Sequence, residues 1–396
     1  MKAKGMGGAS TASSDDAFGG ANNPASMAYA GNRLDLGVDL FSPRRSATRT
    51  GLGGLDASVD SDSKYFLVPE FGYNRMINND LALGVTVYGN GGMNSDYAGG
   101  KIAAGSCGAG APASNLLCGS GSLGVDLMQL IIAPTAAYKV APNHSLGVSP
   151  LIGYQRFKAE GLGAFDNTTV SSSSGNVTNR GYDDAWGYGV RLGYMGKITP
   201  TVTIGAAYAT KMNFQEFNKY KGLFAEQGDF DIPENYNLGV AWQATPVIKL
   251  ALDYQRINYG GVKSINNSSR ANAQLGTDAG RGFGWTDIDV WKLGVEYKYS
   301  QQMTLRAGYN HGENPIGAND VTFNILAPGV VKDHVTLGFT YTMASGDELT
   351  MSYMHAFKND VSGASLLPAF SGGAPSGNEK IDMYQNSLGI QYSWKM

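Results

Sequence analysis

The sequence contains little of what nucleic-acid-binding proteins and common enzymes rely on. Of its 396 residues only 16% are charged, the formal net charge is -3, and there are 4 histidines and 2 cysteines. No basic stripe is present that could neutralise a phosphate backbone, which argues against a nucleic-acid partner. The motifs His-Glu-x-x-His, Gly-x-Ser-x-Gly and Cys-x-x-Cys are absent, so the sequence predicts no catalytic residues, no cofactor and no metal site. A lipase or protease that uses His334 or His355 is the enzymatic alternative.

Long apolar runs are missing as well. The composition is 42% hydrophobic, but mean hydropathy is -0.20, and no stretch approaches the run of about 18 apolar residues that a membrane-spanning helix needs. If the chain enters a membrane, it does so with strands. The residues after Met1 also lack the apolar core of a signal peptide, so we expect the numbering to be that of a processed or re-started chain.

The two cysteines lie close together in the chain. Cys107 and Cys118 fall in one segment rich in glycine, alanine and serine. This placement predicts a loop disulfide formed in an oxidising compartment, such as the bacterial cell envelope. A metal pair is the alternative, but no histidine or carboxylate lies nearby to complete it.

A short phrase recurs through the chain: an apolar residue, a glycine, a second apolar residue, a spacer and an aromatic. Full copies begin at Leu238, Leu293, Leu337 and Leu388. Because side chains in a strand alternate between faces, each copy places its apolar and aromatic members on one face and its glycine and spacer on the other. With 55 glycines, 22 tyrosines and no helical pattern to cover the apolar face, the phrase indicates strands that face lipid. A soluble array of β-sandwiches is the alternative.

Alternating runs predict fourteen strands. Short spacers such as 78-79 alternate strictly with long ones such as 96-124, which is typical of a barrel with brief periplasmic turns and longer extracellular loops. The predicted fold is therefore all-β, a 14-stranded antiparallel transmembrane β-barrel over residues 34-396 in the bacterial (Gram-negative) outer membrane. The runs cover 34-49, 64-77, 80-95, 125-140, 144-160, 182-198, 200-216, 230-244, 246-259, 285-300, 302-312, 332-344, 347-361 and 380-396.

Residues 1-33 carry no strand pattern and are small and polar. Fourteen strands enclose a lumen too wide for the wall side chains alone to fill, since eight strands suffice for a packed interior and sixteen leave a channel. We therefore expect residues 1-33 to fold into the lumen as a hatch. A disordered periplasmic extension is the alternative.

The N-terminal stretch that contains Asn23, Pro24 and Ala25 resembles the hatch of the FadL family, outer-membrane transporters of long-chain fatty acids and of aromatic hydrocarbons. Further matches are the segments 68-73, 83-89 and 219-222. The resemblance covers the whole chain and implies passive transport of a hydrophobic small molecule, which extracellular loops capture, a lumen pocket receives and the barrel wall releases sideways into the membrane.

In the family the sideways exit is a kink in the third strand, beside the Asn-Pro-Ala triplet. The third predicted strand here carries Gly89, Asn90, Gly91 and Gly92. Glycines tolerate unusual backbone angles and have no side chain to block a hole, as a bulge or a break requires. The alternative is an ordinary strand end that feeds a long loop.

A fatty acid would need a cation for its carboxylate. Alternation places Arg191, Lys292 and Arg306 on the lumen face, whereas a wall charge paired with Asp253 or Glu296 is the alternative role for each. The family often carries basic residues near the outer end of the fifth strand. That position holds Arg156 and Lys158 here, so the resemblance implies that they bind the ligand. Alternation places Arg156 on the same face as Ile152 and Tyr154, so either the strand has left the hydrocarbon zone at this point or a bulge switches the face. For the apolar part of the pocket we expect Phe18, Met27 and Tyr88.

The expected function is outer-membrane uptake of hydrophobic small molecules, long-chain fatty acids first. Uptake of monoaromatic hydrocarbons or alkanes by the same route, a porin for hydrophilic solutes, and an adhesin are the alternatives. The expected partners are the substrate, outer-membrane lipid and lipopolysaccharide, and the chain is expected to act as a monomer.

Overall fold

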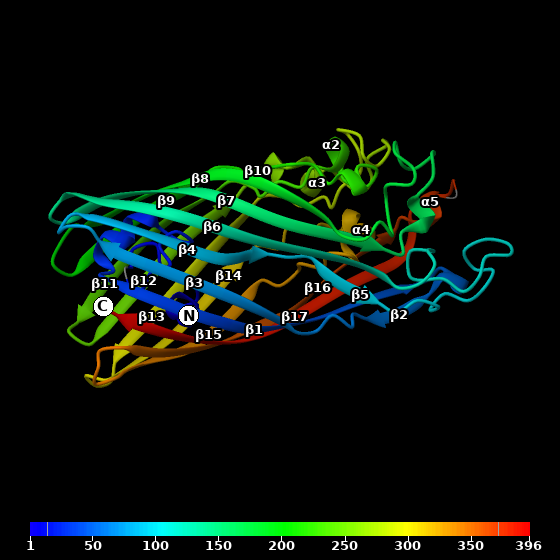
Figure 1. The fold of residues 1–396 in the computed structure, drawn as a ribbon. Helices are drawn as coiled ribbons and strands as arrows, with labels where there is room; N and C mark the ends of the chain where they lie inside the picture. Colours follow the sequence, from blue (N-terminus) through cyan, green and yellow to red (C-terminus); the bar gives the residue numbers. More distant parts are fainter. Residues whose placement is uncertain (14, 371) are drawn as a thin grey trace.

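The wall of the molecule is one antiparallel sheet that closes on itself. The computed structural model describes residues 1–13, 15–370 and 372–396. Fourteen long strands form a barrel (Figure 1), which confirms the predicted fold. The first and last strands pair from Arg33 opposite Lys395 to Thr50 opposite Asn378, and this pairing closes the barrel. The long strands are β1 (Arg33–Thr50), β3 (Phe66–Met76), β4 (Leu81–Gly91), β6 (Leu123–Ala141), β7 (His144–Glu160), β8 (Asp183–Lys197), β9 (Val202–Ala209), β11 (Asn235–Thr245), β12 (Ile248–Ile257), β13 (Ile288–Lys298), β14 (Met303–Gly312), β15 (Asp333–Thr342), β16 (Glu348–Ser365) and β17 (Ser376–Lys395).

Shorter elements lie in the N-terminal segment and in the loops. None of the helices among the described residues is long and apolar enough to cross a membrane. The short strands are β2 (Ala57–Asp60), β5 (Asn94–Tyr97) and β10 (Asn213–Phe214). The helical turns are α1 (Lys2–Gly5), η1 (Pro24–Tyr29), η2 (Gly53–Leu55), η3 (Gly163–Phe165), η4 (Asn218–Tyr220), α2 (Ala225–Gly228), η5 (Tyr259–Gly261), α3 (Lys263–Asn266), η6 (Ala318–Asp320), α4 (Val321–Asn324) and α5 (Leu367–Phe370).

The wall strands alternate between an apolar outer face and a smaller or more polar inner face. On β13, Trp291 and Leu293 are 50% and 49% exposed, whereas Glu296 on the other face is 6% exposed. From Trp291 to Tyr297 every side chain of this outer row is apolar or aromatic, so this part of the outer surface suits contact with lipid.

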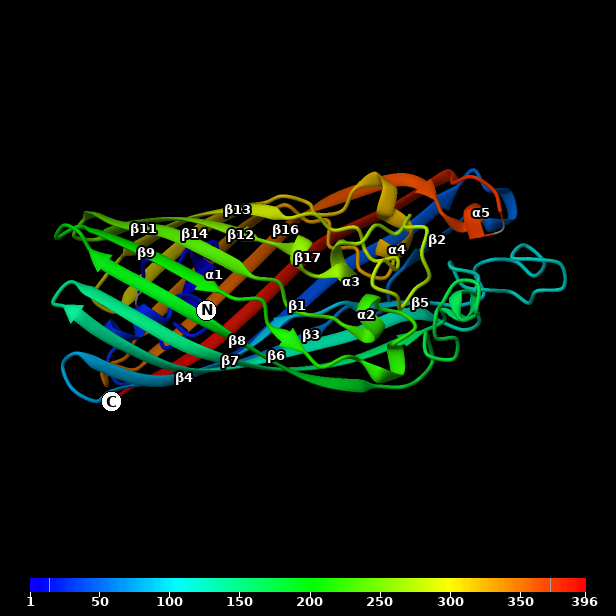
Figure 2. The same ribbon diagram turned by 90° about the horizontal axis from the view of Figure 1, so that it is seen from above.

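The two ends of the barrel differ. Brief turns join the strands at one end, where both chain termini lie, and long loops with the small helices crowd the other end (Figures 1 and 2). We call these the turn end and the loop end.

One predicted strand is shorter than the pattern indicated. The run 200-216 forms a wall strand only as β9, Val202–Ala209, and β10 covers just two residues. Between them the register against β8 shifts by one residue, as in a β-bulge, while the backbone nitrogen of Thr210 still donates to the carbonyl oxygen of Val190 at 3.0 Å. Beyond the shift the ring of Phe214 packs inward, where a Cβ added to Gly153 or Gly187 would lie 2.4 Å from it.

Residues 1–13 and 15–32 lie inside the barrel at its turn end, where α1 and η1 appear in dark blue within the wall (Figure 1). The helix α1 contacts β14, β15 and β16, and η1 contacts β4, β6, β7 and β8. The N-terminal segment, as we call these residues, thus crosses the lumen from one side of the wall to the other.

Candidate functional site

Glycines of the repeated phrase, and of its shortened copies Leu146-Gly147-Val148 and Ile204-Gly205-Ala206, make room for the N-terminal segment. A Cβ added to Gly147 would lie 2.3 Å from the backbone nitrogen of Ala25, one on Gly205 would lie 2.1 Å from the carbonyl oxygen of Thr11, and one on Gly294 would lie 2.7 Å from that of Met6. Heavy atoms this close would clash, so only glycine fits. The phrase therefore has two functions: its apolar members face outward, and its glycine admits the backbone that fills the lumen.

Wall carboxylates hold the N-terminal segment by hydrogen bonds. Asp253 Oδ2 accepts from the backbone nitrogens of Ser10 and Thr11 at 2.8 Å each and from Thr11 Oγ1 at 2.7 Å. Asp35 Oδ2 accepts from the backbone nitrogen of Ala17 at 2.7 Å. Hydrogen bonds to an ionised acceptor are roughly twice as strong as those between neutral groups, so these contacts fix the segment in one position.

The Asn-Pro-Ala triplet begins the turn η1. Asn23 Oδ1 accepts from the backbone nitrogen of Ala25 at 3.1 Å, and Asn23 Nδ2 donates to the carbonyl oxygens of Thr11 and Tyr194 at 2.7 and 2.8 Å. The triplet lies against β7 and β8, because Ser145 Oγ donates to the carbonyl of Ala25 at 2.9 Å. The triplet does not line the cavity that residues 90–92 of the third long strand border, whereas its neighbours Ala21 and Asn22 do.

A cavity of about 520 Å³ lies above the N-terminal segment. Its floor includes Ala21 and Asn22, and its walls include Tyr88, Arg191 and Lys292. Aromatic and aliphatic side chains cover much of the remainder: Phe230, Ile232, Ile257, Tyr259, Ile265, Phe283 and Trp285. We call this space the inner cavity. Three of the predicted ligand-binding residues, Tyr88, Arg191 and Lys292, therefore lie together at it.

The two cations of the inner cavity have no carboxylate partner among the described residues. Arg191 Nη1 donates to the carbonyl oxygen of Gly20 at 2.8 Å, to that of Ala21 and to Tyr88 Oη at 3.3 Å. Lys292 Nζ donates to Gln255 Oε1 at 2.8 Å. Buried charges without a counter-ion are unfavourable, so an anionic group in the cavity would be stabilised by them.

Arg306, the third lumen-facing cation, has a different environment. Its Nη2 lies 2.7 Å from Glu296 Oε2, and its Nη1 donates to Thr340 Oγ1 at 2.6 Å. Arg306 thus has the alternative role given for the lumen-facing cations, a wall charge paired with a carboxylate.

The third long strand is irregular over residues 89–92. Its register against β6 shifts between Gly89 and Gly91, β4 ends at Gly91, and the short strand β5 resumes at Asn94. Its pairing with β3 ends earlier, at Tyr88 opposite Glu70. Among the described residues, 66–69 of β3 therefore have no strand partner on the side of β4. Backbone pairing across this part of the wall resumes only at the bridge between Ser61 and Tyr97. We call this stretch the window; Asn90, Gly91 and Gly92 are exposed and also line the inner cavity.

Four predicted ligand-binding residues lie elsewhere. Met27 is fully buried and packs with Ala28, Ala82 and Ala137, and Phe18 is 6% exposed within the N-terminal segment, so neither lines the inner cavity. Arg156 and Lys158 face the outside of the barrel, where the guanidinium carbon of Arg156 lies 3.8 Å from the centre of the Tyr182 ring. Strand alternation continues without a bulge to the end of β7, so both residues keep the outer face and do not line the inner cavity.

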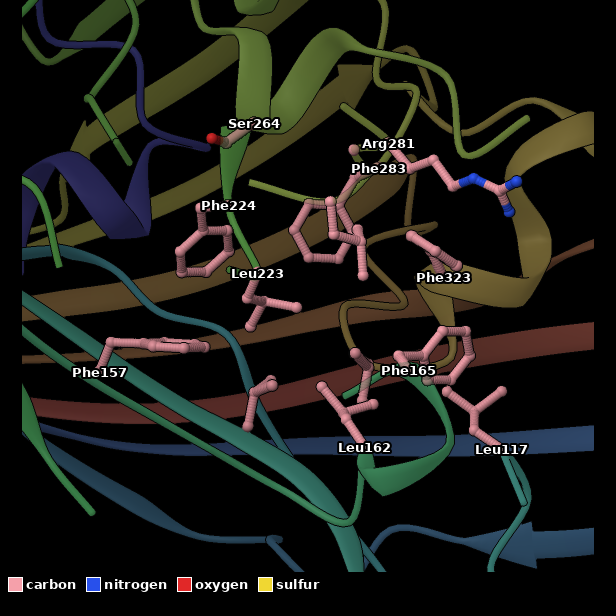
Figure 3. A pocket seen from close by; sticks show the side chains of 14 residues that line it. Leu117, Phe157, Leu162, Phe165, Leu223, Phe224, Ser264, Arg281, Phe283 and Phe323 are labelled. Atoms are coloured by element: carbon pink, nitrogen blue, oxygen red, sulfur yellow. The ribbon is translucent and has the colours of Figure 1, made fainter. Parts of the chain in front are cut away.

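A second, smaller cavity lies among the loops at the loop end. It measures about 40 Å³ and is lined almost entirely by apolar side chains. Figure 3 shows its phenylalanines, Phe157, Phe165, Phe224, Phe283 and Phe323, converging from five segments of the chain, while the guanidinium of Arg281 points away from their rings. We call this space the outer cavity.

The sequence analysis missed the residues of the outer cavity. Phe165, Phe224 and Phe323 stand in loops that are otherwise rich in glycine, serine and asparagine, and bulky aromatics in such loops are a signal of burial that strand patterns ignore. The disulfide between Cys107 and Cys118, in contrast, is present as predicted.

These features together define a class of protein: a transport barrel of the outer membrane, with a lipid-facing wall, an occupied lumen and internal cavities. The sequence profile described as outer membrane protein transport protein (OMPP1/FadL/TodX) matches residues 2–374, and the chain belongs to this family. The family is one of transport proteins of the bacterial outer membrane, and its members carry hydrophobic compounds, as the resemblance implied.

Solved structures share the fold. The toluene transporter TodX of Pseudomonas putida has 18% sequence identity and a TM-score of 0.70 over 100% of this chain and 97% of its own. A FadL homologue of Pseudomonas aeruginosa has 16% identity and a TM-score of 0.70 over 99% and 97%. The toluene transporter TbuX of Ralstonia pickettii has 17% identity and a TM-score of 0.68 over 100% and 97%. No curated protein sequence matches this chain.

Proposed function

We propose that the chain takes up amphiphilic monocarboxylates such as long-chain fatty acids. The observation that carries this proposal is the pair Arg191 and Lys292, two cations at the inner cavity that have only neutral partners among the described residues. A carboxylate bound between them would gain charge-assisted hydrogen bonds, while its acyl chain contacts the apolar part of the cavity.

The proposed route begins at the loop end, continues through the inner cavity and ends at the window. Residues 1–33 act as a hatch that closes the turn end, so the solute leaves sideways into lipid instead of entering the periplasm. The exposure of Asn90, Gly91 and Gly92 at the cavity wall supports this exit. Sideways release suits a hydrophobic solute because the solute never has to enter water.

Uptake of monoaromatic hydrocarbons is the second candidate. Two of the solved structures that share the fold of this chain are described as toluene transporters. Support within this chain comes from the aromatic rings of Tyr88, Phe230 and Trp285 at the inner cavity, since rings pack against rings at offset or edge-to-face angles.

The experiment is uptake of labelled oleate and labelled toluene by cells that lack a transporter of this type and express the chain. We expect oleate uptake, and we expect Lys292→Gln to reduce it by about tenfold or more, because a charge-assisted hydrogen bond contributes about 1.5–3 kcal/mol. Lys298→Gln is the matched control, since Lys298 lies on the same strand but is exposed at the turn end. Toluene uptake alone would select the second candidate, and a large water-filled conductance of the purified chain would refute both.

A further inference from the structure

The inner and outer cavities are separated by one layer of side chains. Only Phe283 lines both of them among the described residues, and it is 7% exposed. We propose that the ring of Phe283 is the gate between the two cavities and sets the width of the molecules that pass. This inference rests on the proposed function, because it assigns a residue that selects among its substrates.

The layer around Phe283 is continuous and apolar. Phe224 lines the outer cavity and Phe230 the inner one, with their ring centres 4.8 Å apart. Val125 and Leu127 of β6 are divided in the same way between the outer and the inner cavity. A hydrated ion cannot cross a packed apolar layer without losing its water, whereas a hydrocarbon chain can replace one apolar contact by another.

The backbone at Phe283 is held firmly. Asn324 Nδ2 donates to the carbonyl oxygen of Phe283 at 2.6 Å, and the backbone nitrogen of Gly284 donates to the carbonyl oxygen of Asn267 at 2.9 Å. The next residue, Trp285, donates through Nε1 to Asn324 Oδ1 at 2.6 Å. The main chain therefore stays in place while the ring turns about its side-chain bonds, and opening consists of a rotamer change.

The glycines on both sides of Phe283 are required by this arrangement. A Cβ on Gly282 would lie 2.7 Å from the carbonyl oxygen of Ser264, and Gly284 has a φ of +69° and would place a Cβ 2.2 Å from Asp320 Cγ. The segment can pass between these neighbours only without side chains. The ring of Phe283 is consequently the sole bulky group of its tripeptide, and its two sequence neighbours have no side chain to restrict it.

The direction of its effect follows from its size. Removing the ring joins the outer space of about 40 Å³ to the inner space of about 520 Å³. A wide solute gains most from this, because a narrow acyl chain needs only a small displacement of the ring. Enlarging the side chain has the opposite effect.

The test compares uptake of decanoate with that of 1-adamantanecarboxylate, which has the same head group and a much wider body. We expect Phe283→Ala to raise the adamantane-to-decanoate ratio by about tenfold, a usual size of discrimination by one apolar pocket contact, and Phe283→Trp to lower it. Phe323→Ala, which changes the outer cavity alone, is the matched control and should leave the ratio within about twofold of the wild type.

The outcomes separate the gate from the proposed function. An unchanged ratio in both Phe283 variants, or an equal change in Phe323→Ala, would overturn the gate while oleate uptake by the wild type still stands. Failure of the wild type to take up any carboxylate would overturn the proposed function and the gate with it. If Phe283→Ala does not assemble, Phe283→Leu is used instead. It keeps a narrower apolar side chain, and we expect it to raise the adamantane-to-decanoate ratio as well.

Discussion

The two ends of the lumen are closed by different kinds of contact. At the turn end, the backbone of the N-terminal segment is held by carboxylates of the wall, above all by Asp253 with three hydrogen bonds. At the loop end, a cluster of aromatic side chains closes the barrel, with Phe157 0% exposed and its ring centre 4.8 Å from that of Phe224. Hydrogen bonds require a defined geometry, so a shift of the N-terminal segment breaks several of them at once. Apolar contacts are non-directional, so a side chain can replace one apolar neighbour by another. Under the proposed function, we therefore expect the turn end to stay shut and the loop end to let apolar molecules through.

The largest expected effect comes from breaking the polar end. Asp253→Ala removes three hydrogen bonds to an ionised oxygen, a loss of about 3 kcal/mol or more, and so raises the population of released N-terminal segment by roughly a hundredfold. We expect ion conductance across planar bilayers and faster hydrogen exchange at residues 8–13.

Two variants control this prediction. Asp253→Asn keeps an acceptor oxygen without the charge and should conduct less than Asp253→Ala. Phe323→Ala makes a comparable opening at the loop end and should not conduct, because the turn end remains shut. Equal conductance of Asp253→Ala and the wild type would show that Asp253 does not hold the segment.

A smaller effect is expected at the window, which borders the inner cavity between the N-terminal segment and the loop end. Gly91→Val adds a side chain where the nearest atom to the new Cβ is Gln129 Oε1 at 3.8 Å, so the barrel accommodates it and the opening narrows. We expect oleate uptake to fall by about tenfold, which corresponds to a barrier raised by about 1.4 kcal/mol. Gly317→Val is the control, since a Cβ there has nothing within 4 Å and Gly317 lies in a loop away from the window.

The same variant distinguishes a sideways exit from an exit through the turn end. In an Asp253→Ala background, a second path is open and Gly91→Val should reduce uptake much less. If Gly91→Val had no effect in the wild type, the solute would not leave through the window.

The strands could be predicted from the sequence because their signal is local. Alternation along β13 and β17 depends on residues two positions apart, and the glycine of each phrase could be assigned to the inner face from the same rule. The same rule was correct for Arg156 and Lys158, which lie on the outer face as alternation required, without the bulge that would have turned them toward the lumen.

The contents of the lumen could not be predicted in the same way. Met27 was expected at a ligand pocket. Its side chain instead fills the space left by Gly84, where an added Cβ would lie 2.4 Å from Met27 Cε. The sequence analysis predicted no function for Phe283. The position of its backbone depends on hydrogen bonds with Asn324 and Asn267, which lie in other parts of the chain. Contacts between segments without a repeating pattern are set by tertiary packing, and one sequence carries no periodic trace of them.

The smallest expected effect is a difference in pH dependence between the two ends. At the turn end, burial raises the pKa of Asp15, but Lys249 and Lys2 outweigh burial and hold this pKa below its ordinary value of 3.8. An acid of this kind stabilises the folded state above its ordinary pKa, and the contribution is lost as the pH falls through that value. The contacts of the N-terminal segment should therefore weaken below a pH of about 4.

At the loop end the sign is reversed. Burial and the neighbouring carboxylate of Asp231 raise the pKa of Asp229 to about 7. Between its ordinary value and about 7, folded Asp229 keeps a proton that the unfolded chain has released, so local stability falls as the pH rises through this window. Hydrogen exchange at residues 228–232, corrected for the intrinsic effect of pH, should become faster from about pH 4 to about pH 7, and Asp229→Asn should abolish the change. Exchange at this segment that slows over the same range would mean that Asp229 is stabilised by a cation, as at the turn end, and that the two ends do not differ in this respect.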